Sequence, residues 1–162
     1  MIGFMANETP PKTPITLLIN GLHSKSGGGV TYLNNILPLF GQAAGVDVHL
    51  CIHADQKDLL IVDVPGVTVH ELSFPTGFWK LLWREQVDVP RLARRIGAAV
   101  TFSPANYGPL LASNTVILLR NALNVGLVER RPAKIAYWIL LYVATGLSLL
   151  FSKRAITVSD YA

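Results

Sequence analysis

Short apolar runs that alternate with longer helical patterns are the feature that most restricts the fold of this chain. A run that is apolar on both faces is typical of a strand buried in a parallel sheet. Such runs are expected to form six strands, at 15–20, 46–52, 67–72, 98–103, 115–119 and 155–158. Because parallel strands need crossover connections that cover both faces of a sheet, the pattern predicts a doubly wound α/β domain with a mostly parallel sheet.

Helical patterns occupy three of the intervals between these strands. Apolar residues recur at helical spacing over 30–40, where Pro38 is expected to kink the helix near its end. The segment 78–96 has the same period, and we expect it to break near Pro90, because proline removes a backbone donor inside a helix. A long apolar helix is expected over 132–151.

Length and composition predict one domain with a sizeable core. The chain has 162 residues, of which 51% are apolar and 15% charged. The first fourteen residues carry three prolines and no continuous apolar stretch, so we expect 1–14 to be a flexible leader and not a signal peptide. Cys51 is the single cysteine, which excludes an internal disulfide and favours a reducing, cytoplasmic location.

Several classes of function are disfavoured by the motifs. The net charge is only +4, and the basic residues form short groups without interleaved aromatic residues, so no nucleic-acid partner is expected. The four histidines are scattered without the spacing of metal ligands, so no metal is expected. The glycines at 27–29 fit neither G-x-G-x-x-G nor a P-loop, which argues against a nicotinamide oxidoreductase and a nucleotide-triphosphatase.

Polar segments follow three of the predicted strands, at 20–29, 103–109 and 120–124. In an open parallel sheet, ligands bind beyond the carboxyl ends of the strands, so these segments should meet at one edge. The glycines at 27–29 would let backbone N–H groups approach an anion, and Arg120 with Asn121 would add a cation and an amide. A tight turn without a ligand and a solvated strand end remain the alternatives.

The order and spacing of four segments carry a family resemblance: LLINGLHSKSGGGVTYLNNILPLF, WREQVDVPRLARRIGAAVTFSPANYGPLL, VILLRNAL and AITVSDYA. Together they resemble the N-terminal domain of a family 4, group 1 glycosyltransferase of the GT-B type, over 15–162. Members of that family are retaining enzymes that move a sugar from a nucleotide-sugar to an acceptor in the cleft between two Rossmann-like lobes.

The resemblance implies a role for particular residues. The loop that faces the donor phosphates would consist of Gly27, Gly28 and Gly29. The acceptor side would be lined by His23, Asn106, Tyr107, Arg120 and Asn121. The nucleotide-sugar would be a co-substrate, no further cofactor is implied, and the acceptor would be a saccharide or a lipid-linked molecule.

The chain departs from the family pattern in two ways. Many members have a histidine directly after the fifth strand, where this chain has Arg120 and Asn121. The paired glutamates of the donor lobe, spaced E-x7-E, have no counterpart. Ser159 is a good helix N-cap with only three residues after it. We therefore expect 15–162 to be an acceptor-side domain truncated before the donor-binding domain, and to be inactive alone.

The main alternative is a non-catalytic, membrane-associated binding module of Rossmann-like fold. The segment 135–151 is uncharged, with Lys134, Lys153 and Arg154 at its ends. At about 1.5 Å per residue it would be roughly 25 Å long, short of the roughly 30 Å hydrocarbon layer. We expect a buried crossover helix in a cytoplasmic protein, with at most a peripheral contact to the inner face of the membrane.

Overall fold

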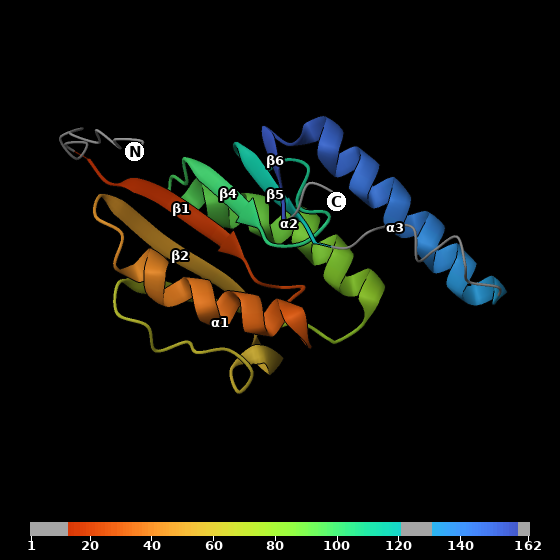
Figure 1. Ribbon diagram of the computed structural model, residues 1–162, viewed down its shortest axis with the longest axis horizontal. Coiled ribbons are helices and arrows are strands. Elements are labelled where there is room, and N and C mark those ends of the chain that lie inside the picture. The colour runs from red at the N-terminus through yellow and green to blue at the C-terminus, as the bar shows by residue number, and fades with distance from the viewer. Residues whose placement is uncertain (1–12, 121–130, 159–162) are drawn as a thin grey trace, which may run out of the picture.

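The computed structural model describes residues 13–120 and 131–158, and Figure 1 shows them as a sheet with helices on both faces. All neighbouring strands are parallel, in the order β3-β2-β1-β4-β5-β6. The strands are β1 (Ile15–Asn20), β2 (Val46–His53), β3 (Val67–Leu72), β4 (Val100–Ser103), β5 (Thr115–Leu119) and β6 (Arg154–Thr157). The doubly wound α/β prediction is confirmed.

The helices divide between the two faces of the sheet. They are α1 (Gly28–Gly41), α2 (Phe78–Arg95) and α3 (Pro132–Phe151), with a short 3-10 turn, η1 (Ala54–Gln56), after β2. In Figure 1, α1 lies in front of the sheet, whereas α2 and α3 lie behind it. The loop expected at Gly28 and Gly29 is in fact the first turn of α1.

Strand β1 lies inside the sheet and contributes to two hydrophobic cores. Because successive side chains of a strand point to opposite faces, Leu17 and Ile19 pack with Leu33 and Leu37 of α1, whereas Leu18 packs in the core of α2. The end of β1 is therefore held between two helical layers. The segment that follows it carries the first residues of the predicted site.

The prediction that α2 breaks near Pro90 is wrong. The helix runs continuously through Pro90, which is itself buried. An interior proline costs about 3 kcal/mol, but α2 buries apolar side chains on both sides of it, with Leu81 before and Leu92 after. Packing of an amphipathic face supplies most of the stability of such a helix, so the stripe outweighs the lost hydrogen bond.

The expectation for α3 is correct in topology and wrong in burial. The helix does connect the parallel strands β5 and β6 as a crossover. However, only one stripe of it, including Leu141, Thr145 and Ser148, is buried, and most of its apolar side chains are exposed. A uniformly apolar sequence shows no face preference, so the pattern could not reveal which side of the helix would remain open.

Gly41, at the end of α1, allows a close approach that any side chain would prevent. A Cβ there would overlap the carbonyl oxygen of Pro65. We predict that Gly41→Ala lowers the free energy of unfolding by about 2 kcal/mol or more, because backbone must move to relieve the overlap. Urea denaturation of both proteins measures the difference.

Gly146→Ala is the matched control for this substitution. Gly146 lies inside α3, and a Cβ there would have nothing within 4 Å. Replacing an unhindered helical glycine by alanine should raise the free energy of unfolding by about 0.5–1 kcal/mol. Equal effects of the two substitutions would contradict the packing of α1 against the β2–β3 connection.

Candidate functional site

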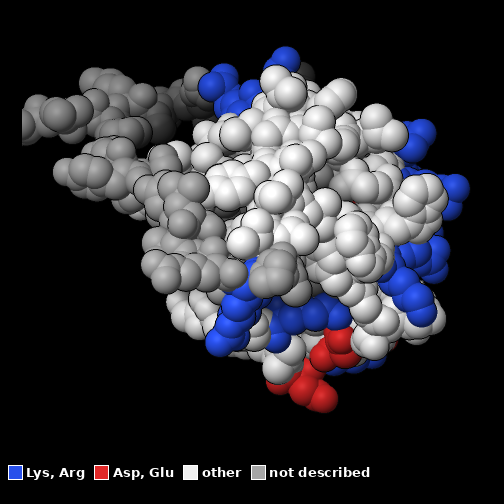
Figure 2. Space-filling view, turned by 90° about the vertical axis from the view of Figure 1, so that its right-hand side faces the viewer, with Lys and Arg blue, Asp and Glu red and all other residues white. Residues whose placement is uncertain are grey.

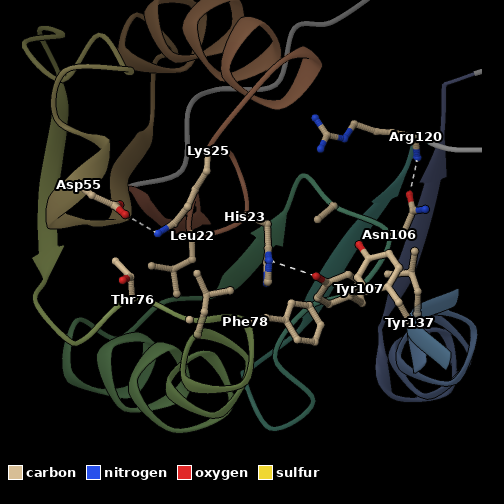
Figure 3. Close-up of a pocket in the computed structure, with 14 residues that line it drawn as sticks. Leu22, His23, Lys25, Asp55, Thr76, Phe78, Asn106, Tyr107, Arg120 and Tyr137 are labelled. Atoms are coloured by element: carbon tan, nitrogen blue, oxygen red, sulfur yellow. Dashed lines mark hydrogen bonds and ion pairs between the residues drawn. The ribbon is translucent and has the colours of Figure 1, made fainter. Parts of the chain in front are cut away.

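A pocket of about 520 Å³ opens where the strand order reverses, between β1 and β4. The carboxyl ends of parallel strands and the loops after them meet at such a point. Segments that follow β1, β4 and β5 form the walls, and the first turn of α2 together with Tyr137 and Leu141 of α3 completes them (Figure 3). Residues that line it include His23, Lys25, Phe78, Tyr107, Arg120 and Tyr137.

A buried carboxylate lies beneath the floor of this pocket. Glu85 of α2 is completely buried, and its Oε2 lies 2.9 Å from Nε2 of His23. Its Oε1 accepts a hydrogen bond of 2.6 Å from Nδ2 of Asn20 at the end of β1. The same amide group donates to Oγ of Ser103 at the end of β4. The two hydrogen bonds of the Asn20 amide thus hold the carboxylate at the ends of the two central strands, and His23 lies in contact with it.

The partners of His23 determine where its proton lies. Nε2 of His23 and Oε2 of Glu85 lie 2.9 Å apart but without the alignment of a hydrogen bond. Because a carboxylate only accepts hydrogen bonds, this contact favours the neutral tautomer that carries its proton on Nε2 and leaves Nδ1 as an acceptor. The hydroxyl of Tyr107 donates to this Nδ1 over 3.2 Å. In this arrangement a carboxylate lies at one nitrogen of an imidazole and a hydroxyl lies at the other. It is the arrangement of an oriented general base.

Tyr107 keeps its proton over the ordinary pH range. Burial raises the pKa of its hydroxyl, and the nearby negative charge of Glu85 raises it further. The ring of Tyr107 also packs edge-on against the His23 ring, with 4.6 Å between the ring centres. Tyr107 therefore acts as a neutral donor, and its ring restricts the position of the imidazole.

The opposite side of the pocket is cationic. The side chain of Arg120 extends from the end of β5 toward α1 (Figure 3), and a Cβ on Gly29 would lie 3.3 Å from its Nη2. The guanidinium thus lies beside the N-terminal turn of α1, where backbone N–H groups favour anions. Burial lowers the pKa of Arg120 from its ordinary value, and the nearby Tyr32 opposes that shift.

Two further contacts shape the pocket. The amide side chain of Asn106 accepts a 2.8 Å hydrogen bond from the backbone N–H of Arg120, which joins the loops after β4 and β5. Across the pocket, Nζ of Lys25 lies 2.7 Å from Oδ2 of Asp55. Burial raises the pKa of Asp55, but hydrogen bonds from Lys25 and His53 together outweigh this effect and lower it.

Among the described residues, no group of acidic, histidine or cysteine side chains is suited to hold a metal.

Most of the predicted site residues lie together. His23, Asn106, Tyr107 and Arg120 all line the pocket, and the expected adjacency of the glycines and Arg120 is confirmed at Gly29. Gly27 and Gly28 face open space, because a Cβ on either would have nothing within 4 Å. Asn121 lies outside the described residues. The functions of all these residues remain predictions.

Glu85 is the residue that sequence reasoning missed. A signal was present, because Glu85 occupies a position of the buried stripe that also contains Leu81, Val89 and Leu92. A charged residue at an apolar position of an amphipathic helix is expected to have a buried partner. The partner, His23, is 62 residues away in sequence (85 − 23), so the pairing itself could not be read from spacing.

The fold and the pocket together define a Rossmann-like α/β domain with a two-sided pocket at the switch point of its sheet. One side carries an oriented imidazole, and the other combines a helix N-terminus with an arginine. Comparisons with protein families, with curated proteins and with solved structures gave no match.

The His23–Glu85 pair leads to a prediction about the imidazole proton. In Glu85→Gln the new amide oxygen can still accept from Asn20, so its NH₂ group faces Nε2 of His23 and donates to it. We predict that the neutral His23 ring then carries its proton on Nδ1, the reverse of the parent protein. Ring ¹⁵N chemical shifts in NMR spectra distinguish the two tautomers.

His53 serves as the internal control for this measurement. Its Nε2 lies 2.8 Å from the carbonyl oxygen of Phe74, and its Nδ1 contacts the N–H and the carboxylate of Asp55, so none of its partners is altered by the substitution at Glu85. The His53 signals should be the same in both proteins. An unchanged His23 tautomer in Glu85→Gln would contradict the proposed orientation of the imidazole by the carboxylate.

Proposed function

We propose that this domain forms the acceptor-side wall of a retaining glycosyltransferase that uses a nucleotide-sugar donor. The proposal combines the order of motifs over 15–162 with one observation on the site. That observation is a pocket lined by His23 and by Arg120, whose guanidinium lies beside the N-terminal turn of α1.

The cationic side suits the donor half of the reaction. A nucleotide-sugar releases a nucleoside diphosphate, and negative charge increases on its phosphate oxygens as the sugar departs. Backbone N–H groups at a helix N-terminus and a guanidinium are the groups that bind such oxygens best. No described residue forms a hydrogen bond or ion pair with the Arg120 guanidinium, so its donors are available to a phosphate.

The His23 side suits a hydroxyl-bearing acceptor. In the structure the hydroxyl of Tyr107 donates to Nδ1 of His23 over 3.2 Å, and an acceptor hydroxyl that replaced this hydrogen bond would accept from Tyr107 and donate to Nδ1. A sugar hydroxyl both donates and accepts, so it can bind to this pair. One pocket is lined by both His23 and Arg120, and the guanidinium of Arg120 lies beside the N-terminal turn of α1, so an acceptor and a diphosphate would bind close to one another.

The alternative of a non-catalytic binding module gives no account of Glu85. Removing a carboxylate from water costs several kcal/mol even when it has partners. The hydrogen bonds of Asn20 to Glu85 and Ser103 would be structural in either kind of domain, and the contact of the carboxylate with an imidazole that lines a pocket is what favours a catalytic one. An apolar side chain in the same stripe of α2 would pack there without the cost.

The donor side is tested by titrating uridine diphosphate into the ¹⁵N-labelled chain. We predict the largest amide shifts at Gly28 and Gly29, at the start of α1. Arg120→Gln should weaken binding by about tenfold or more, because a hydrogen bond to a charged group contributes about 1.5–3 kcal/mol. Arg91→Gln is the matched control, since it removes the same charge from an exposed position on α2 that lines a different pocket.

Two results would contradict this part of the proposal. One is that the two arginine substitutions weaken binding equally, which would indicate attraction by net charge alone. The other is that the amide shifts occur away from α1.

A further inference from the structure

Helices α2 and α3 lie side by side on one face of the sheet and present a broad apolar surface to solvent. An apolar groove of about 170 Å³ between them is lined by residues of both, including Leu82, Val143 and Leu147. We define the apolar face as the outward side chains Trp79, Trp83, Ile139, Val143, Leu147 and Leu150. Trp79 and Trp83 are 68% and 69% exposed, and Leu150 is 81% exposed. A contiguous apolar area of this kind marks an interaction surface.

Helix α3 is suited to lie on a membrane and not to cross one. It is the one helix of the described chain that is long and apolar enough for a span, over Lys134–Phe151. One stripe of it, however, packs on the domain, where Oγ of Ser148 accepts from the backbone N–H of Gly108 over 3.1 Å. A span would break these contacts and would expose the sheet beneath, so the helix stays with its domain.

Basic residues lie beside the apolar face. Lys80 and Arg84 follow the two tryptophans on α2, where Arg84 also lies 3.2 Å from Asp88, and Lys134 and Lys153 lie at the two ends of α3. Figure 2 shows a wide area without charged side chains, with Lys and Arg above it, to its right and below it. Acidic side chains in this view are confined to the lower edge.

We infer that the apolar face docks this protein onto the surface of a bilayer that contains anionic lipids. Tryptophan is the side chain best suited to the boundary between headgroups and acyl chains. Lysine and arginine around an inserted apolar face are attracted to anionic headgroups. A second copy of the chain fits less well, because a symmetric contact would bring two cationic borders together.

This inference does not depend on the sugar-transfer proposal, since no residue of the pocket's anion or imidazole side takes part in it. The test is flotation of the 162-residue chain with vesicles of phosphatidylcholine alone, and with vesicles in which about one third of the lipid is phosphatidylglycerol. We expect strong association with the second kind, and at least about tenfold weaker association with the first or at high salt.

The double variant Trp79→Ser/Trp83→Ser should associate with the anionic vesicles at least about tenfold more weakly, because it removes two inserted aromatic side chains. Leu39→Ser is the control. Leu39 is 69% exposed on α1, on the opposite face of the sheet, so its replacement should leave vesicle binding unchanged. Circular dichroism of each variant verifies that the fold is retained.

Intrinsic fluorescence gives a second measurement that needs no variant. The three tryptophans of the chain, at 79, 83 and 138, all lie on α2 and α3. Anionic vesicles should therefore shift the emission to shorter wavelength. Equal binding of the tryptophan double variant, or an unshifted emission, would overturn the inference. The inference would also be overturned if the protein formed dimers with rising concentration and did not bind vesicles. That result would indicate that the apolar face contacts a second copy of the chain.

Discussion

The buried carboxylate of Glu85 is the contact on which the site depends. It joins α2 to Asn20 at the end of β1 and, through that amide, to Ser103 at the end of β4. It also orients His23, whose second nitrogen meets Tyr107. Leaving one member of such a buried pair without its partner costs about 3–5 kcal/mol. These hydrogen bonds therefore tie the floor of the pocket to the ends of β1 and β4.

Helix α2 connects this pocket to the outer surface of the molecule. Its inner stripe carries Glu85 toward β1, while its outer stripe presents Trp79 and Trp83 to solvent. Because a helix has 3.6 residues per turn, its side chains fall on different sides, and the residues of the pocket and those of the outer surface lie on opposite sides of α2. On the other side of the sheet, α1 brings its N-terminal turn to Arg120. The reversal of strand order brings both helices to one edge.

The strands and the outline of the site were predictable because each depends on local pattern. Apolar runs identify strands, including β6, whose residues are exposed, and parallel pairing puts His23, Tyr107 and Arg120 at one edge without further information. Three features depend on distant contacts and were not predictable. They are the continuity of α2 through Pro90, the exposed side of α3, and the pairing of side chains far apart in sequence. The paired side chains are Glu85 with His23, and His49 with His70, whose ring nitrogens lie 2.8 Å apart.

The central claim is that this domain supplies one wall of a cleft in which a sugar is transferred. The most direct measurement is a product assay with a panel of nucleotide-sugars and hydroxyl-bearing acceptors, on the 162-residue chain and on a protein in which a donor-binding domain follows it. The account predicts no appreciable transfer by the chain alone, and transfer by the longer protein that His23→Ala lowers by about a hundredfold or more. Robust multiple-turnover transfer by the chain alone, or full activity of the longer protein with His23→Ala, would contradict it.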